Sequence, residues 1–225
     1  MAPKRRRRSP AVEDYVKAIY SLAERGTGVA TTNALAERLG VTPPSASSMT
    51  KKLDRLGLVT RIPYRGVRLT PQGEDLALKV LRQHRLLELY LADTLGLSWD
   101  EVHDEADRLE HAMSDELEEA IAARLGHPTR DPHGDPIPGR DGQIDERPTV
   151  SLAALAAGMQ GTFVRVSDAD PEMLRYLATR GISPGDRFEV VERQPFGGAF
   201  VVRFGAALHA LGASLAGVMR VEVSV

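Results

Sequence analysis

Four side chains that can bind a metal ion lie within one short acidic segment of the chain. His103, Asp107, Glu110 and His111 stand at offsets of zero, four, seven and eight. If the segment is helical, all four face one side, because residues four and seven apart share a helix face. Imidazole and carboxylate groups together bind divalent cations. The segment therefore predicts a metal site, whose role could be catalytic, structural or sensory.

A second pair of possible ligands precedes this segment. His84 and Glu88 stand four apart in a long segment with an apolar stripe, so they also share a helix face. An antiparallel pairing of the two helices would bring the pairs together. Asp14, near the start of the chain, is a further candidate, although it could be an ordinary exposed charge. The chain has no cysteine, so nitrogen and oxygen must supply most ligands. We expect the remaining histidines at the surface: His127, His133 and His209.

The elements that would position these residues begin with three short helices. Apolar residues recur with helical spacing over residues 12–25, which precede Gly26. A second helix follows Thr31 or Thr32 as its cap and stops at Gly40. A third begins after a tight connection containing two prolines and ends at Gly57. Two short helices joined by so brief a turn predict a helix-turn-helix that binds DNA.

Residues 58–69 read as two strands around Tyr64-Arg65-Gly66, a wing whose arginines could reach phosphates. The third helix is rich in small polar residues followed by two lysines, which suits a DNA groove. We expect base edges to be read at its start and phosphates to be held by its basic residues and the wing. The candidate DNA-binding residues are Thr42, Pro44, Ser45, Ser47, Ser48, Lys51, Lys52, Arg61 and Arg65.

The charge distribution supports this division of roles. The net charge is -2, but residues 1–68 carry fourteen Lys or Arg against five Asp or Glu, and residues 98–146 carry four against fifteen. The first block could approach phosphates and the second could hold cations. No apolar run approaches the roughly 20 residues needed to cross a bilayer, and no signal-peptide pattern follows the basic tail. We expect a cytoplasmic protein without membrane association.

The C-terminal third predicts a small β-barrel. Residues 128–148 are rich in Pro, Gly and Asp without an apolar period, as in a linker or irregular loop. Beyond them, residues 162–167, 187–194, 200–204 and 218–225 read as strands. The predicted fold is α+β: a basic flexible tail (1–10), a winged helix-turn-helix (11–73), a helical metal-binding domain (74–127), a Pro/Gly linker (128–148) and a small β-barrel domain (149–225).

An enzyme that uses the same acidic cluster is the alternative from another class. Zinc peptidases place two histidines four apart with the catalytic glutamate between them, and the residues after Glu110-His111 do not fit that motif. There is no Gly-rich phosphate loop and no Gly-x-Ser-x-Gly elbow. We therefore expect no catalytic residue and no enzymatic activity.

The order of these parts resembles the diphtheria toxin repressor family of metal-dependent transcription regulators. The resemblance covers nearly the whole chain and is most specific at residues 83–86, 102–106, 110–111 and 131–138. It implies a homodimer that binds double-stranded operator DNA, with dimerisation through the helical domain (74–127) and an SH3-like, FeoA-like fold for the small β-barrel (149–225). It also implies two metals near the junction of the DNA-binding and dimerisation domains. By the same resemblance, His84, Glu88 and His103 match the ancillary metal site, and Glu110 and His111 match the primary site.

The remaining ligands of the primary site distinguish branches of that family. Iron-responsive members have methionine and cysteine where this chain has Asp14 and Asp107. Carboxylates in place of sulfur favour a hard cation such as Mn²⁺, so the chain resembles the manganese-responsive branch. One departure is Lys17, where short manganese regulators have a glutamate. Longer members add an ancillary ligand from the barrel, and Asp168 lies where it falls, with Asp170 as the alternative.

The resulting expectation is a manganese-dependent repressor of metal uptake genes, in which metal favours the operator-binding dimer. Two Mn²⁺ sites per chain are expected. An iron-dependent repressor of the same architecture, with Fe²⁺ as its metal, is the alternative within the family.

Overall fold

The computed structural model describes residues 9–24, 28–145, 147–195 and 197–224. The contacts within the chain divide it into two units, each described by itself below. The first comprises residues 1–83, 110–113 and 138–143, and the second comprises residues 84–109, 114–137 and 144–225. Helix α4 (Pro71–Leu95) contributes residues to both. Most of the predicted basic tail, residues 1–8, lies outside the described residues.

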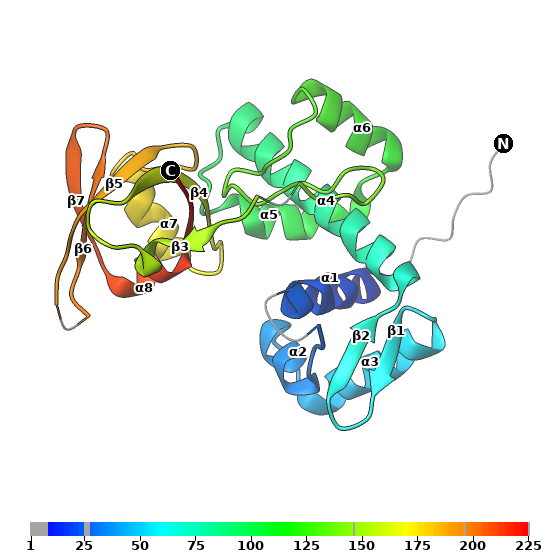
Figure 1. The fold of residues 1–225 in the computed structure, drawn as a ribbon. Helices are drawn as coiled ribbons and strands as arrows, with labels where there is room; N and C mark the ends of the chain where they lie inside the picture. Colours follow the sequence, from blue (N-terminus) through cyan, green and yellow to red (C-terminus); the bar gives the residue numbers. More distant parts are fainter. Residues whose placement is uncertain (1–8, 25–27, 146, 196, 225) are drawn as a thin grey trace. The chain divides into compact units, whose positions relative to one another are not determined.

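The first unit contains the winged helix (Figure 1). Its elements are α1 (Pro10–Glu24), α2 (Thr32–Arg38), α3 (Pro43–Arg55), β1 (Val59–Ile62), β2 (Gly66–Leu69), the start of α4 and the 3₁₀ helix η1 (Glu110–Ala112). The side chains of Thr31 and Thr42 accept hydrogen bonds from backbone N–H groups at the starts of α2 and α3. These bonds satisfy donors that a helix start leaves unpaired, which explains why both helices begin there.

The wing is an antiparallel pair in which Thr60 lies opposite Arg68. Ala30, just before α2, forms an isolated antiparallel bridge with Val67 of β2. Gly66 sits against this bridge with φ 130°, and a Cβ there would lie 2.1 Å from the carbonyl oxygen of Ala30. Glycine is therefore required where the wing meets the segment around Ala30. The core below combines the apolar face of α1 with Leu35, Leu53 and residues of the wing.

The second unit holds the rest of the helical region. It contains the end of α4, α5 (Val102–Leu109) and α6 (Asp115–Arg124), the last capped by Ser114. The prediction of one helix from His103 through His111 is wrong, because α5 ends at Leu109 and η1 follows. In η1 the Met113 N–H donates to Glu110, and the next helix begins at once. Such tightening into 3₁₀ geometry is common where a helix ends, so Glu110 and His111 belong to η1 and not to α5.

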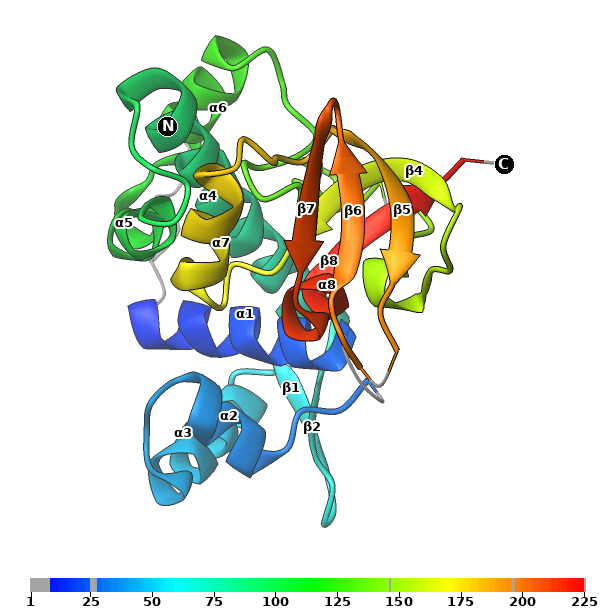
Figure 2. The ribbon, with the colours of Figure 1, turned by 90° about the vertical axis from the view of Figure 1, so that its left-hand side faces the viewer.

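The C-terminal part of the second unit is a curved antiparallel sheet. Its order is β3-β8-β4-β5-β6-β7, and Figure 2 shows β5, β6 and β7 as neighbouring strands. The bounds are β3 (Val150–Ser151), β4 (Gln160–Val166), β5 (Arg187–Arg193), β6 (Phe200–Phe204), β7 (Ala207–Leu211) and β8 (Met219–Val223), with η2 (Leu152–Ala154), α7 (Pro171–Ala178) and α8 (Ala213–Val218) between them. Phe163, Leu174 and Met219 are fully buried in its core. The predicted α+β class with a small C-terminal β domain is confirmed.

The segment predicted as a linker or irregular loop has no helix or strand among its described residues, but part of it is packed. Asp131, His133 and Ile137 are buried. The N–H of Val166 in β4 donates to the carbonyl oxygen of His133, at 3.0 Å. The expectation of a surface position for His133 is therefore wrong, because the composition of the segment gave no sign of its tertiary contacts. In the part of the chain described, no helix has the length and apolar character needed to cross a membrane.

Candidate metal centres

The first centre consists of Asp14 on α1 and Glu110 and His111 on η1. Its donor atoms lie close together: His111 Nε2 is 2.8 Å from Asp14 Oδ1 and 3.7 Å from Glu110 Oε1. Helix α1 buries Val12, Val16 and Ile19 on one face, which leaves Asp14 on the side turned toward η1. Amphipathic spacing of α1 therefore positions one ligand, and the 3₁₀ turn positions the other two.

Two neighbours hold this centre in place. Glu13 Oε2 accepts a hydrogen bond from His111 Nδ1 at 2.7 Å, which leaves Nε2 available as a ligand atom. Lys17 donates to both carboxylate oxygens of the buried Glu110, at 2.7 and 2.9 Å. Burial raises the pKa of Asp14, while the nearby His111 and Lys17 oppose that shift. Lys17 thus already supplies a positive charge to one carboxylate of the centre.

The second centre consists of His84 and Glu88 on α4, His103 on α5 and Asp168 after β4. Glu88 Oε1 lies 3.0 Å from His84 Nε2 and 3.1 Å from His103 Nδ1. His103 Nδ1 is also 3.1 Å from His84 Nε2 and 3.1 Å from Asp168 Oδ2. The donor atoms of His84, Glu88 and His103 therefore lie within 4.8 Å of one another, and Asp168 joins them through its contact with His103. His84 and Glu88 are buried, and the other two are partly exposed.

The charges of the second centre are strongly coupled. Burial alone would raise the pKa of Glu88, but His84, His103 and His133 lower it well below its ordinary value. Hydrogen bonds from His103 to Asp168 and to Glu88 raise the pKa of His103 to about 10. Burial opposes ionisation of Asp168, yet the bond from His103 lowers the pKa of Asp168 to about 2. Without a metal, a protonated His103 contacts both carboxylates and offsets one of their two negative charges.

Both donor sets fit a divalent cation. Nitrogen and oxygen donors bound at roughly 2.1 Å from a first-row ion stand roughly 3 Å apart, and the spacings in the second centre are 3.0 and 3.1 Å. In the first centre, one pair lies at 2.8 Å and another at 3.7 Å. The donor atoms of each set, Asp14, Glu110 and His111 in one and His84, Glu88 and His103 in the other, lie within 4.8 Å of one another.

Two further sequence candidates are Asp107 and Asp170. Asp107, predicted for the primary site, contacts His84 at 3.3 Å and His103 at 3.8 Å, and its role as a primary-site ligand stays a prediction. Asp170 accepts hydrogen bonds from the N–H groups of Glu172 and Met173 and so caps α7. Asp168 contacts His103 instead. The geometry therefore favours Asp168 over Asp170 as the barrel's contribution to the second centre.

Three residues support the centres through contacts that the sequence did not indicate. Glu13 and Lys17 act on residues more than ninety positions away in the chain, and an i, i+4 pattern of acidic and basic residues on α1 is too common to reveal this. His133 is buried, donates from Nε2 to the carbonyl oxygen of Trp99 at 2.7 Å, and places Nδ1 3.9 Å from Glu88. It therefore supports the carboxylate that joins both histidines of the second centre.

The candidate DNA-binding residues share the exposed side of α3 and the wing. Each is exposed except Ser47, which is half-buried, and Thr42 also forms the N-cap of α3. Tyr64, which was not among the predicted contacts, is fully exposed at the tip of the wing and has φ 60°. A bulky side chain in this conformation is uncommon. Because Tyr64 is also exposed beside the candidate DNA-binding residues of the wing, it is a further candidate for contact with DNA.

Comparison with known proteins assigns the chain to a family. Residues 9–67 match the family described as "Iron dependent repressor, N-terminal DNA binding domain", residues 70–139 match "Iron dependent repressor, metal binding and dimerisation domain", and residues 150–223 match "FeoA domain". The chain is 35% identical over 220 residues to the diphtheria toxin repressor of Corynebacterium efficiens, covering 93% of this chain and 94% of that protein. The chain belongs to the diphtheria toxin repressor family.

The names of other members of the diphtheria toxin repressor family refer to different metals. The iron-dependent repressor IdeR of Mycobacterium tuberculosis is 34% identical, covering 93% of this chain and 96% of that protein. A solved structure named as a manganese-dependent transcriptional repressor in complex with manganese is 46% identical, with a TM-score of 0.87, and covers 95% of this chain and all of that one. The chain is a metal-dependent transcriptional repressor of this family, and the prediction of a regulator rather than an enzyme is confirmed.

Proposed function

We propose that this repressor responds to Mn²⁺ and controls genes for metal uptake. The observation that carries the proposal is the pair formed by Asp14 and His111 at 2.8 Å, beside the buried Glu110. A site with two carboxylates and one imidazole suits a hard cation, whereas sulfur ligands would favour softer ones. The 46% identity to a manganese-dependent repressor supports the same choice.

The residues of the first centre can convert metal binding into a change in DNA affinity. A bound ion supplies two positive charges and links α1 to η1. Through Asp14, the ion would tie α1 to Glu110 and His111. Helix α1 in turn packs against α2 and the wing strand β2. We propose that this link between α1 and η1 fixes the spacing of the two winged helices in a homodimer. For metal to promote DNA binding, it must bind the DNA-competent arrangement more tightly than the others.

The second centre has a separate role in the proposal. His84, Glu88, His103 and Asp168 would hold a second ion per chain, with Asp168 supplied by the C-terminal β domain. That ion would stabilise the contact between this domain and the helices α4 and α5. The first centre controls DNA binding, and the second supports it.

The DNA contacts follow from α3 and the wing. Thr42, Pro44 and Ser48 would read base edges at the start of α3, with Ser45 and Ser47 beside them. Lys51, Lys52, Arg61 and Arg65 would hold phosphates, since charged groups at the edges of such a surface position the protein without reading sequence.

The deciding experiment is a fluorescence anisotropy titration on DNA taken from upstream of the chain's own reading frame. Free Mn²⁺, Co²⁺, Zn²⁺ and, without oxygen, Fe²⁺ are each buffered at matched concentrations. We expect Mn²⁺ to induce operator binding at lower free concentration than Fe²⁺. Equal or stronger activation by Fe²⁺ would overturn the choice of manganese and leave the iron-dependent alternative, which the iron-named relatives support.

A paired substitution tests the ligand argument directly. Asp14→Met combined with Asp107→Cys introduces the two sulfur side chains that the resemblance attributes to iron-responsive members. We expect the response to shift from Mn²⁺ toward Fe²⁺, because sulfur is a softer ligand than carboxylate oxygen. Asp104→Cys, which introduces a thiol on an exposed position of α5, is the control. An unchanged metal preference in the paired variant would contradict the assignment of Asp14 and Asp107.

A further inference from the structure

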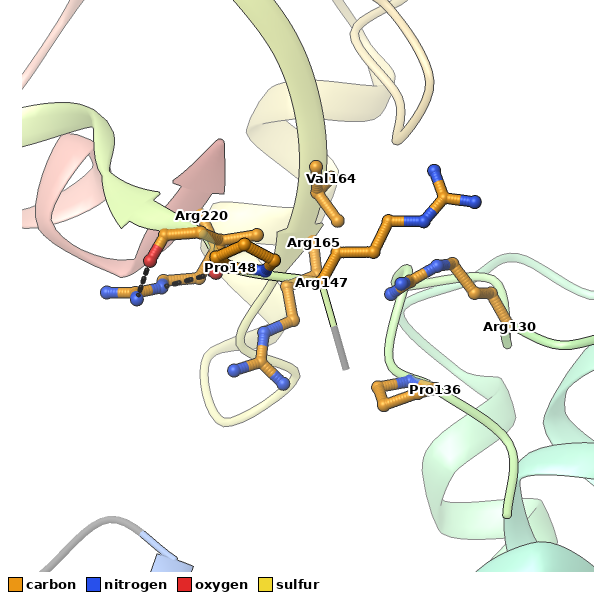
Figure 3. A pocket seen from close by; sticks show the side chains of 8 residues that line it. Arg130, Pro136, Arg147, Pro148, Val164, Arg165 and Arg220 are labelled. Carbon is orange, nitrogen blue, oxygen red and sulfur yellow. Dashed lines mark hydrogen bonds between the residues drawn. The ribbon is translucent and has the colours of Figure 1, made fainter. Parts of the chain in front are cut away.

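A cavity of about 240 Å³ lies at the edge of the C-terminal β domain, outside both metal centres. Four arginines line it: Arg130, Arg147, Arg165 and Arg220. Figure 3 shows Arg147 and Arg130 on opposite sides of the view, with the Arg165 side chain extending above Arg130. Pro136 and Pro148 complete the wall. The cavity thus combines four positive charges with rigid backbone.

The carboxylates near these arginines do not balance their charge. Arg165 pairs with Asp135 at 3.0 Å, and that same carboxylate lies 3.9 Å from Arg85. In the described stretches of the chain, no carboxylate is paired with the other three arginines of the cavity. Arg130 donates to the carbonyl oxygens of Gly134 and Asp145, and Arg220 donates to Thr149. Carbonyl oxygens orient a guanidinium but do not neutralise it.

The wall of the cavity is fixed by close backbone packing. A Cβ on Gly134 would lie 1.9 Å from the carbonyl oxygen of Val164, so this glycine allows the segment to lie directly on β4. The N–H of Val166 donates to the carbonyl oxygen of His133, and Arg130 forms a bridge with Pro136. The arginines on the two sides are therefore held near one another by the backbone, which reduces the ordering cost of binding a ligand between them.

We propose that this cavity binds a small phosphate-bearing anion. Guanidinium groups recognise phosphate oxygens with paired N–H donors, and a multiply charged anion would offset the repulsion among the four arginines. The volume of about 240 Å³ is below the roughly 300–1,000 Å³ of cavities that enclose drug-sized ligands. A compact anion such as pyrophosphate fits this size better than a nucleotide does. The site is independent of the proposed response to manganese.

Isothermal titration calorimetry on the full chain tests the proposal. The protein is first freed of divalent metal, because pyrophosphate itself binds Mn²⁺, and the buffer contains no phosphate. Pyrophosphate, orthophosphate and citrate are the probes. We expect pyrophosphate to bind with one site per chain and about tenfold more tightly than orthophosphate, since it can engage more guanidinium groups.

Arg147→Gln is the principal variant, because Arg147 supports no described hydrogen bond within the fold. We expect it to weaken pyrophosphate binding about tenfold, the effect of one lost charged hydrogen bond. Adding Arg165→Gln should weaken binding about 100-fold. Arg187→Gln removes the same charge from an exposed position of β5 outside the cavity and should change the affinity less than about twofold. Thermal unfolding of each variant verifies that it is folded. If the double variant does not fold, the single variant Arg147→Gln is sufficient to test the proposal.

Four outcomes would overturn the proposal. These are absence of pyrophosphate binding at millimolar concentration, equal affinity in wild type and Arg147→Gln, equal loss in Arg187→Gln, and citrate binding as tightly as pyrophosphate. Competition from a short duplex without an operator identifies another ligand class. If this DNA displaces pyrophosphate from the wild type and Arg147→Gln weakens its binding, the cavity holds DNA phosphates.

Discussion

The two metal centres differ in what already neutralises their carboxylates. In the first, a lysine side chain contacts both oxygens of Glu110. In the second, a protonated His103 side chain contacts both Glu88 and Asp168. A metal entering the second centre has to displace a proton, whereas a metal entering the first has to displace Lys17. Under the proposed function, metal binding would rearrange the first centre around Lys17, as a switch requires, whereas the second would need little rearrangement.

The largest expected effect tests whether the first centre is the switch. His111→Ala removes a ligand and also frees Glu13 from its hydrogen bond. We expect Mn²⁺ to lose its effect on operator affinity, a change of about 100-fold if the coupling is near the upper end of the usual range. Anisotropy titration with and without Mn²⁺ measures it. His209→Ala on β7 removes an imidazole outside both centres and should retain the response.

If His111→Ala retains the response while His84→Ala abolishes it, the roles of the two centres are reversed. His84→Ala is expected to weaken the response without removing it, because the second centre supports rather than controls DNA binding. Metal content measured on each purified variant shows which centre has been emptied.

The second prediction concerns Lys17 as an internal competitor of the metal. Lys17→Met removes the charge but keeps most of the side-chain length. We expect Mn²⁺ to bind the first centre about tenfold more tightly, because no cation has to leave Glu110. The metal-free protein should also lose about 3 kcal/mol of stability, since a buried carboxylate loses its charge partner. Competition with a fluorescent chelator measures the affinity, and urea unfolding measures the stability.

Lys51→Met is the matched control, because Lys51 is exposed on α3 and away from the first centre. It should alter neither the metal affinity nor the stability appreciably. Weaker Mn²⁺ binding in Lys17→Met would show that Lys17 positions Glu110 for the metal instead of competing with it.

These contrasts could be predicted from the sequence only in part. The i, i+4 spacing of His84 and Glu88 placed both on one face of α4, and the acidic segment supplied His103. Local periodicity is enough for such placements. The contacts of Glu13 and Lys17 with η1 join residues more than ninety positions apart. They depend on tertiary packing, which a single sequence does not reveal.

The change of helix type at Glu110 shows the same limit at short range. The residues from His103 to His111 fit a continuous helix face, yet α5 ends at Leu109 because η1 and the Ser114 cap of α6 follow directly. Similarly, Pro and Gly in residues 128–148 predicted a linker, although His133 is buried beside Glu88. Element types were predicted more reliably than ends and long-range contacts, because ends depend on neighbouring elements.

The third prediction distinguishes Asp168 from Asp170. Asp168→Asn removes the carboxylate that contacts His103, and we expect metal binding at the second centre to weaken about fivefold, since one charged ligand becomes neutral. Asp170→Asn keeps an N-cap side chain on α7 and should leave metal binding unchanged. Titration of the His111→Ala background isolates the second centre. Equal effects of the two variants would mean that Asp168 is not a ligand.

The smallest expected effect is a pH dependence confined to the second centre. The pKa of His103 is raised to about 10, so below that pH the metal-free side chain carries a proton that must leave before the nitrogen binds metal. Metal binding therefore strengthens as the pH rises, about threefold between roughly pH 7.0 and 7.5, with release of about one proton. Calorimetry of His111→Ala in buffers of different ionisation enthalpy counts that proton. Asp168→Asn removes the main cause of the raised pKa, so the slope should become shallower. An unchanged slope in Asp168→Asn would show that the displaced proton does not reside on His103, and the contrast between a proton in one centre and a lysine in the other would fail.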